Sequence, residues 1–269
     1  MKYWIKRSVL PFGIVCLMSM ALCGCGREKK EAVTVQPELV IGSDDYEPYN
    51  YQDENGDYAG VDVELAKEAC RRIGYTPVFK QIQWDDKDIY LENGEVDCAW
   101  GSFSMDGRED DYIWVGPYMY SREVVMVRTD SDIYKLDDLA GKNVAVQSST
   151  QPERIFLGQG YDIIPKVKNV YSFVEMNELF AALRKGYVDA CAGHEIVMQE
   201  YLRQSGQKYR ILDEEIIDSK LGVAFSKKNT QKAEQLRQAM AEMLEDGTVQ
   251  CILEKYGMED RVAAGGITP

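Results

Sequence analysis

Short apolar runs and amphipathic segments alternate along most of the chain. The apolar runs of the first part predict strands at residues 39–42, 78–82, 96–100 and 123–128. Between the first two, Val61, Leu65, Ala69 and Ile73 recur at the spacing of one helix face, and Gly74 follows as a natural stop. A short helix ending at Gly94 is expected before the third strand.

The same alternation restarts after residue 140. It predicts strands at residues 143–147, 165–170, 188–192, 209–212 and 221–225, and helices at residues 152–157, 172–185, 195–204, 230–246 and 248–256. Ser172 and Glu175 have the spacing of a capping box, so the second of these helices is expected to open there. Strands that alternate with helices predict an α/β fold with mainly parallel sheets.

A faint internal repeat relates the two parts. Residues 93–101 and 185–193 share the order of helix end, glycine, Val-Asp, apolar strand and glycine. In open α/β sheets, ligands bind beyond the carboxyl ends of the strands. The loops that follow, residues 101–108 and 193–195, are therefore predicted to face a ligand.

The N-terminus has the pattern of an export signal. Basic residues precede an uncharged, mostly apolar run at residues 9–22, which predicts a signal peptide over residues 1–24, with a stray apolar helix as the alternative. The ending Leu-x-Gly-Cys resembles the lipobox of bacterial lipoproteins. That resemblance implies lipidation of the Cys25 thiol, with Cys23 as the alternative. Residues 25–37 would form a polar tether, and no later apolar stretch is long enough to span a bilayer.

The charge balance argues against two classes of partner. The net charge is −14, and it becomes −17 when the three basic residues of the leader are removed. Such an acidic chain is unsuited to nucleic acid or to an anionic membrane surface. The 245 residues from Cys25 onward suffice for one large or two ordinary domains.

The cysteines predict core packing rather than chemistry. After Cys25 they stand at apolar positions of the strand and helix patterns, at Cys70, Cys98, Cys191 and Cys251. None has the spacing of a metal site, so neither a metal nor a cofactor is expected. One disulfide among them is the alternative.

The loop at residues 101–108 carries the clearest candidate chemistry. Its sequence, Gly-Ser-Phe-Ser-Met-Asp-Gly-Arg, offers two hydroxyls, backbone N–H groups and the guanidinium of Arg108. A planar guanidinium flanked by neutral donors is suited to a small carboxylate. The alternative is a solvated turn.

Other segments lie at comparable strand ends. Residues 44–51 are rich in aromatic residues, Trp84 follows the next strand, and residues 147–151 enter a helix whose first N–H groups attract carboxylates. Each has a structural alternative: core packing for the tyrosines, a half-buried surface position for Trp84, and helix capping for Ser149 and Thr150.

Together these residues resemble the extracytoplasmic solute-binding proteins of ABC importers, in particular the polar amino-acid family. That family is also similar to the ligand-binding cores of ionotropic glutamate receptors. The resemblance covers about residues 38–258. It rests on Ile41-Gly42-Ser43-Asp44, Pro48-Tyr49, the run Gly-Val-Asp-Val-Glu-Leu-Ala at residues 60–66, Gly94-Glu95-Val96-Asp97, Arg108, Pro117-Tyr118, residues 136–146, Gly186-Tyr187-Val188-Asp189-Ala190 and Asp246-Gly247-Thr248.

The resemblance implies a two-lobed periplasmic-binding-protein type II fold. Its implied parts are lobe 1 at residues 38–124 plus 222–258, lobe 2 at 130–216, and a two-strand hinge at 125–129 and 217–221. From the sequence itself, residues 259–269 are expected to form a disordered tail. An amino acid or related small carboxylate would be enclosed between closing lobes and delivered to a membrane permease. The protein would be a monomer, lipid-anchored at the extracytoplasmic face of the bacterial cytoplasmic membrane.

The resemblance also implies roles for residues. Arg108 would bind the α-carboxylate with Ser102, Ser104 and N–H groups near Thr150, while aromatic rings would sandwich the ligand and Asp44 would lie near the family's pocket acid. The full candidate set is Asp44, Tyr46, Trp84, Gly101, Ser102, Ser104, Arg108, Ser149, Thr150, Gln151, His194 and Glu195.

Position 194 departs from the family pattern. Many members have an Asp there that holds the α-ammonium, whereas this chain has its single histidine. A neutral imidazole brings no charge, and a protonated one would repel an ammonium. Either Glu195, Asp44 or Asp45 takes the role with cation–π help, or the ligand is not a plain α-amino acid. A further alternative is that His194 only caps the following helix.

Two other classes of function are compatible with these residues. One is an enzyme on the same fold, for instance a dehydratase that uses His194 and Glu195 as a general acid/base pair. The other is a receptor subunit that reports ligand occupancy to a sensor. Because no nucleophile triad, phosphate loop or metal cluster supports catalysis, we expect a non-catalytic binding component for uptake.

Overall fold

One mixed sheet of eight strands runs through the described part of the chain, in the order β4-β1-β5-β10-β6-β9-β7-β8. The structure is a computed structural model that describes Met1 and residues 36–159, 163–206 and 208–263, so the predicted signal peptide and lipidation site lie outside it. The strands are β1 Glu38–Ser43, β4 Thr76–Gln81, β5 Cys98–Ala99, β6 Ile113–Arg128, β7 Asn143–Gln147, β8 Asn169–Phe173, β9 Ala190–His194 and β10 Tyr209–Phe225, with a separate hairpin of β2 Tyr51–Gln52 and β3 Tyr58–Ala59.

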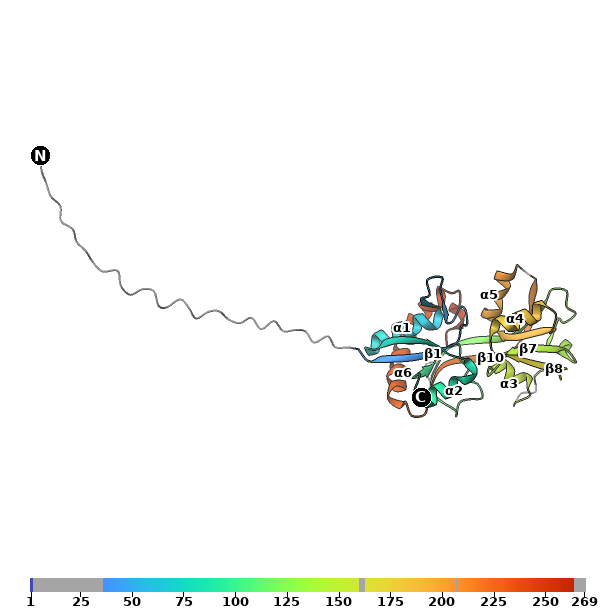
Figure 1. Ribbon diagram of the computed structural model, residues 1–269, viewed down its shortest axis with the longest axis horizontal. Helices are drawn as coiled ribbons and strands as arrows, with labels where there is room; N and C mark the ends of the chain where they lie inside the picture. The colour runs from blue at the N-terminus through green and yellow to red at the C-terminus, as the bar shows by residue number, and fades with distance from the viewer. Residues whose placement is uncertain (2–35, 160–162, 207, 264–269) are drawn as a thin grey trace. The chain divides into compact units, whose positions relative to one another are not determined.

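The helices gather in two groups along this sheet (Figure 1). Beside β1 lie α1 Val61–Ile73, α2 Lys87–Asn93, α6 Thr230–Glu245 and α7 Thr248–Glu254; beside β7 and β8 lie α3 Gln151–Phe156, α4 Met176–Arg184 and α5 Glu195–Ser205. The predicted face of α1 is its buried face, with Val61, Leu65 and Ala69 fully inaccessible to solvent. The apolar spacing predicted this helix correctly, because the helix packs against the rest of the protein through one face.

Two long antiparallel strands, β6 and β10, connect the two groups. β10 pairs with β5 through Ala224 and Phe225, whereas β6 pairs with β9 from Glu123 to Val127. The pairs on either side, β1 with β4 and β5, and β7 with β8 and β9, are parallel. The expectation of parallel pairing is met within each group, while the strands that join the groups are antiparallel.

The capping box predicted at Ser172 is wrong. Ser172 and Phe173 belong to β8 and pair with Val146 and Gln147 of β7. Helix α4 begins only at Met176, and its N-cap residue makes no side-chain cap hydrogen bond. Pairing with β7 satisfies the backbone here, so strand formation takes precedence over the local helix signal.

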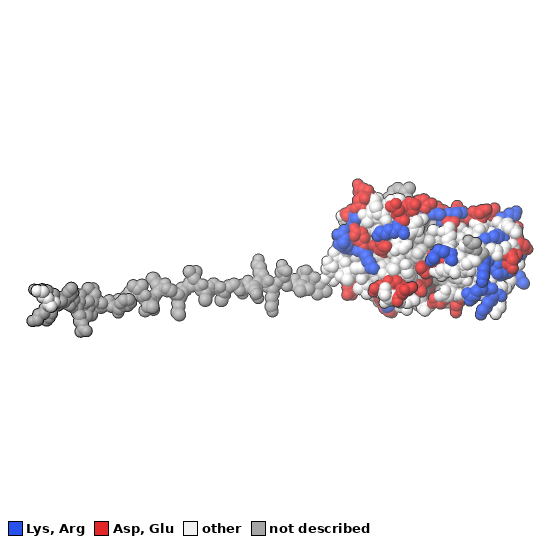
Figure 2. Space-filling model, turned by 90° about the horizontal axis from the view of Figure 1, so that it is seen from above, with Lys and Arg blue, Asp and Glu red and all other residues white. Residues whose placement is uncertain are grey.

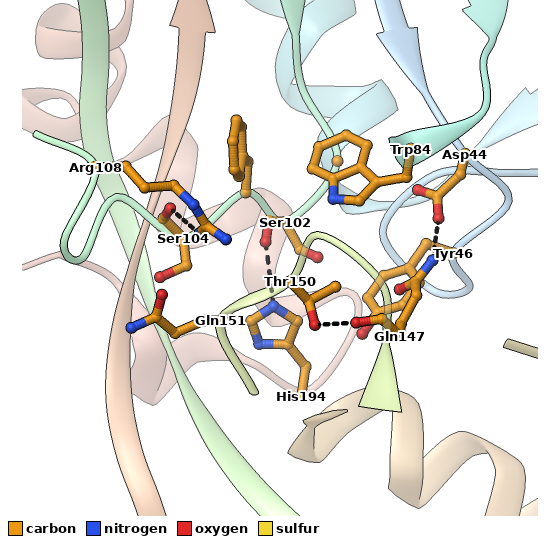
Figure 3. A pocket seen from close by; sticks show the side chains of 12 residues that line it. Asp44, Tyr46, Trp84, Ser102, Ser104, Arg108, Gln147, Thr150, Gln151 and His194 are labelled. Carbon is orange, nitrogen blue, oxygen red and sulfur yellow. Dashed lines mark hydrogen bonds between the residues drawn. The ribbon is translucent and has the colours of Figure 1, made fainter. Parts of the chain in front are cut away.

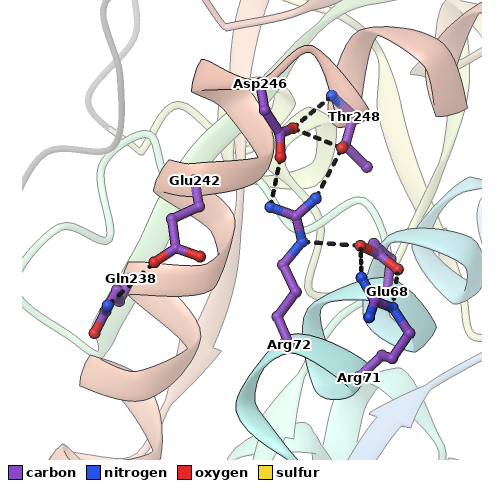
Figure 4. A network of polar contacts seen from close by, with 7 residues as sticks. All are labelled: Glu68, Arg71, Arg72, Gln238, Glu242, Asp246 and Thr248. Carbon is purple, nitrogen blue, oxygen red and sulfur yellow. Dashed lines mark hydrogen bonds and ion pairs between the residues drawn. The ribbon is translucent and has the colours of Figure 1, made fainter.

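The C-terminal helices belong with the first group of elements. The guanidinium of Arg72 on α1 donates to Asp246 at 2.7 Å and to Thr248 at 2.8 Å (Figure 4). Hydrogen bonds from Thr248 and Arg72 lower the pKa of Asp246 to about 2. This network fixes the turn between α6 and α7 against α1.

Disorder predicted from residue 259 onward is wrong for residues 259–263. Glu259–Arg261 forms a 3-10 turn, Val262 bridges to Met119, and the Ala263 N–H donates to the Tyr118 carbonyl at 3.2 Å. The segment is ordered because β6 accepts its backbone pairing. Residues 264–269 lie outside the described residues.

The cysteines are core residues with one exception. Cys70, Cys98 and Cys191 are buried, as predicted, and none of the four cysteines in the described part is in a disulfide. Cys251 is exposed, because the short helix α7 buries Val249, Ile252 and Leu253 instead.

The surface carries charges of both signs. Acidic and basic side chains are interspersed on the face that Figure 2 shows, so the net acidity does not form one continuous acidic surface there. Among the described helices, none combines the length and the apolar character needed to cross a membrane.

Candidate functional site

A cavity lies where the loop after β5 meets the ends of β7 and β9. It contains about 300 Å³ of space not occupied by protein atoms, open solvent included. Its lining consists of Asp44, Tyr46, Trp84, Gly101, Ser102, Phe103, Ser104, Arg108, Gln147, Thr150, Gln151 and His194 (Figure 3). Of the twelve residues predicted from sequence, the structure brings all but Ser149 and Glu195 to this wall.

A buried acid on α1 shapes the loop at residues 101–108. Asp62 accepts the Ser102 N–H at 2.7 Å and the Tyr118 hydroxyl at 2.8 Å. Ser102 has a φ of +44°, and a Cβ on Gly101 would lie 2.2 Å from the Ser43 Oγ, so a larger residue there would force the Ser43 hydroxyl to move. Burial raises the pKa of Asp62 to about 7. The loop conformation therefore depends on a carboxyl group some forty residues earlier in the chain.

Arg108 is a buried cation on the cavity wall. Its Nη1 donates to the Ser104 carbonyl and its Nη2 to the Ser149 carbonyl, each at 3.1 Å. The guanidinium carbon lies 5.2 Å from the centre of the Phe103 ring, which adds a cation–π contact. Ser149, placed behind the wall, thus holds Arg108. A guanidinium fixed in this way can bind a carboxylate with two parallel hydrogen bonds.

Aromatic rings form another part of the wall. Trp84 and Phe103 are in edge contact, with ring centres 4.9 Å apart, and both are buried. Tyr46 also lines the cavity, whereas Tyr49 is fully buried, with its hydroxyl 3.3 Å from the Ser121 hydroxyl. Of the two tyrosines, only Tyr46, the one predicted as a site residue, lines the cavity.

The opposite wall comes from the end of β7. Gln147 Nε2 donates to Asp44 at 2.6 Å, and the Thr150 hydroxyl donates to the Gln147 carbonyl at 2.6 Å. Burial raises the pKa of Asp44 to about 6, although the Gln147 hydrogen bond opposes that shift. Gln147 and Phe103 were not among the predicted site residues. The position of Gln147 at a strand's carboxyl end could have identified it.

His194 contacts the loop of the first group directly. Its Nε2 lies 3.1 Å from the Ser102 carbonyl, and its Nδ1 lies 3.2 Å from Oε1 of Glu123. Because a carbonyl only accepts, Nε2 carries a proton. Burial lowers the pKa of His194 to about 4, so the ring is neutral near pH 7. His194 makes no side-chain cap hydrogen bond to α5, which argues against a capping role alone.

The structure places Glu195 away from the cavity. One carboxylate oxygen is 2.9 Å from Arg122 and the other is 2.9 Å from Arg261. The prediction of Glu195 as a cavity residue is therefore wrong, since these arginines hold both oxygens. The acid that faces His194 is Glu123 on β6, which sequence reasoning missed. Asp45 is exposed and is not part of this cavity wall either.

Two α/β groups joined by two long strands, with a polar cavity between them and a buried arginine in its wall, define a bilobal solute-binding protein. Residues 39–259 match the bacterial extracellular solute-binding proteins, family 3, and the chain belongs to that family.

Named relatives agree with this assignment. The L-cystine-binding protein TcyA of Bacillus subtilis is 27% identical over 95% of this chain and 99% of its own length. The histidine-binding periplasmic protein of Escherichia coli is 27% identical over 94% and 97%. A solved structure of an ancestral arginine-binding protein bound to arginine is 28% identical, with a TM-score of 0.75 over 82% of this chain and 98% of that one.

The fold is therefore the predicted α/β periplasmic-binding-protein type II fold. The chain is the extracytoplasmic, amino-acid-binding component of an ABC transporter. These relatives are binding proteins, so the expectation that the chain is not an enzyme is confirmed.

Proposed function

We propose that this protein captures one free amino acid in the cavity, with Arg108 as the receptor of the α-carboxylate, and delivers it to a membrane permease. The observation that carries the proposal is the buried guanidinium of Arg108, held by two backbone carbonyls on the cavity wall. Cystine, histidine and arginine, the ligands in the names of the relatives, are the first candidates.

The other wall residues complete the proposed site. Ser102, Ser104 and Thr150 would supply neutral donors, and Gly101 would allow close approach of the ligand to the backbone. Tyr46 and Trp84 would pack on the apolar part of the ligand, and Gln151 would contribute from the start of α3. Asp44, tied to Gln147, would act mainly in joining the two walls.

The ligand would be enclosed between the two lobes assigned from sequence, with β6 and β10 as the connecting strands. Hydrogen bonds that cross the cavity support this division: Asp44 with Gln147, Ser102 with His194, Arg108 with Ser149, and Gly107 with Arg154. Each joins the first group of elements to the second.

Thermal-shift screening of the twenty amino acids and L-cystine tests the assignment. We expect one or a few of them to stabilise the purified protein. Arg108→Gln should then abolish the shift. Loss of the buried cation should weaken the binding free energy of a carboxylate ligand by ~3 kcal/mol, which raises the Kd over a hundredfold. Arg154→Gln is the matched control, because Arg154 bonds the Gly107 carbonyl without lining the cavity. An unchanged ligand shift in Arg108→Gln would remove Arg108 from the proposed role.

We also propose that the mature protein is anchored by a lipid on Cys25. The basis is the lipobox-like sequence before it. Cys25→Ala should move the protein from the bacterial membrane fraction to the soluble fraction and abolish labelling by a palmitate analogue. Cys23→Ala is the control and should stay membrane-bound. Retention of Cys25→Ala in membranes would contradict the anchor.

A further inference from the structure

A buried acid lies behind His194, among residues that the proposed site does not use. Glu123 on β6 is fully inaccessible to solvent. Its Oε1 lies 3.2 Å from Nδ1 of His194 and accepts the Ser219 hydroxyl at 3.4 Å. Its Oε2 has no hydrogen-bond partner among the described residues. A buried carboxyl oxygen without a protein partner is available to a hydrogen-bond donor of a ligand.

Glu123 lines an annex of the main cavity. The annex contains about 200 Å³ of space not occupied by protein atoms, and its lining includes Glu123, Pro152 and Met176. It shares four lining residues with the main cavity, namely Tyr46, Gln147, Thr150 and His194. The shared walls place Glu123 beside the space that Arg108 lines.

His194 determines where the proton of this pair lies. Its Nε2–H is committed to the Ser102 carbonyl, so a neutral ring presents the lone pair of Nδ1 to Glu123. Two lone pairs 3.2 Å apart would repel each other, and a proton between them removes the repulsion. Burial raises the pKa of Glu123 to about 8 and lowers that of His194 to about 4. In the free protein at pH 7 the proton therefore sits on Glu123.

We propose that Glu123 and His194 together bind the α-ammonium group of the amino acid. The O–H bond of the Glu123 carboxyl breaks as the ligand enters, and that proton leaves to solvent. The ammonium then donates one N–H to the carboxylate and another to Nδ1. This inference rests on the proposed function, and it accounts for the histidine at position 194: the negative charge comes from β6 instead.

The other groups around Glu123 do not supply that charge. Burial, followed by the charge of Glu123, raises the pKa of Tyr46 well above its ordinary value, and burial likewise raises the pKa of Tyr49, so both are neutral. The charge of Arg108 opposes the rise in the pKa of Glu123, and that of Asp106 adds to it. Asp106 itself accepts the Ser104 hydroxyl and the Lys220 N–H.

Discrimination between an amino acid and its deaminated analogue tests the proposal. The probe is the amino acid that most stabilises the wild-type protein, paired with its analogue in which hydrogen replaces the amino group. For arginine, histidine and cystine these are 5-guanidinopentanoate, 3-(imidazol-4-yl)propionate and 3,3′-dithiodipropionate. By titration calorimetry, Glu123→Gln should bind the amino acid at least about tenfold more weakly and the analogue within about twofold of wild type.

The matched control is Glu195→Gln, a buried glutamate beside His194 whose carboxylate faces Arg122 and Arg261. It should keep the preference for the amino acid. Equal loss of affinity for both probes in Glu123→Gln, or no loss, would overturn the role of Glu123. If no amino acid binds the wild-type protein at all, the proposed function fails first, and the two failures are thus distinguishable.

A measurement on the wild-type protein does not depend on the variant folding. Calorimetric titrations at pH 7 in phosphate and in Tris should differ by the ionisation heat of nearly one proton released per amino acid bound. The deaminated analogue should release none. Tight binding of an amino acid without proton release would overturn the proposal.

Discussion

Two serines at the cavity adopt a backbone conformation that is rare for residues other than glycine. Ser102 and Ser149 have φ values of +44° and +59° and are the non-glycine residues with positive φ in the part of the chain described. A carboxylate accepts the N–H of each at 2.7 Å, from Asp62 in one case and from Glu153 in the other. Strain held by surrounding contacts is typical of functional sites. Here the strained conformations point the Ser102 carbonyl toward His194 and the Ser149 carbonyl toward Arg108.

The buried carboxyl groups of Asp62 and Glu123 should make the stability of the protein depend on pH. The pKa of Asp62 is raised from 3.8 to about 7 and that of Glu123 from 4.5 to about 8. Together with Asp44, whose pKa is raised from 3.8 to about 6, these groups give the folded protein more protons than the unfolded chain between about pH 4 and pH 8. The pKa of His194, lowered from 6.5 to about 4, opposes them only below about pH 6.5. The free energy of unfolding therefore falls as the pH rises through that range. We expect the ligand-free Tm to fall by at least ~4 °C between pH 5.5 and pH 8.5, measured by calorimetry.

The variant Asp62→Asn isolates one of these groups. Its Tm should fall less steeply with pH, because the amide does not titrate. The amide oxygen can accept the Ser102 N–H and the amide N–H can donate to the Tyr118 hydroxyl, as the protonated carboxyl of Asp62 does. Glu195→Gln, whose acid is paired with two arginines, should keep the wild-type slope. A Tm that rises toward pH 8.5 in the wild-type protein would contradict the assigned protonation states.

Sequence reasoning identified most of the cavity wall because that wall is built at strand ends. Gly101, Arg108 and Thr150 follow strands and His194 ends β9, where the topology of α/β sheets places ligands. It missed Glu123 because this residue lies in the middle of β6, where an isolated acid gives no local signal. It misplaced Glu195 because its two arginine partners are far away in the sequence.

At the scale of elements, regular periodicity predicted the structure well and interrupted periodicity did not. Strand β7 has the predicted bounds, and α1 begins and ends at the residues that defined its apolar face. β6 is much longer than the predicted strand, since Pro117 within it is a signal against a strand. β10 was predicted as two strands, because an acidic run at residues 213–215 interrupts its apolar pattern.

Two ion pairs join elements that lie far apart in the sequence. Arg261 of the C-terminal turn and Arg122 of β6 both bind Glu195, the first residue of α5. The C-terminal turn also packs on β6 through the bridge between Val262 and Met119. Glu195 thus connects the second group of helices to the C-terminal turn through Arg261 and to β6 through Arg122.

At the scale of the whole molecule, contacts across the cavity hold the two groups together. Four of these contacts are hydrogen bonds, either to backbone carbonyls or between polar side chains. Water can replace such partners when the groups separate, so each bond contributes only ~1 kcal/mol net. A ligand that bonds both walls at once would add contacts that only the closed arrangement provides.

We therefore expect the ligand-free protein to sample more open arrangements about β6 and β10, and the amino acid to close it. Small-angle X-ray scattering should show a radius of gyration that falls by roughly a few per cent of the ~18 Å expected for a compact chain of this length. Arg108→Gln should give no change at the same ligand concentration, because the ligand then no longer bonds both walls. A constant radius of gyration in the wild-type protein, with binding shown by calorimetry on the same sample, would mean that the cavity is formed before the ligand arrives. In that case the contacts across the cavity, rather than the ligand, would set the closed arrangement.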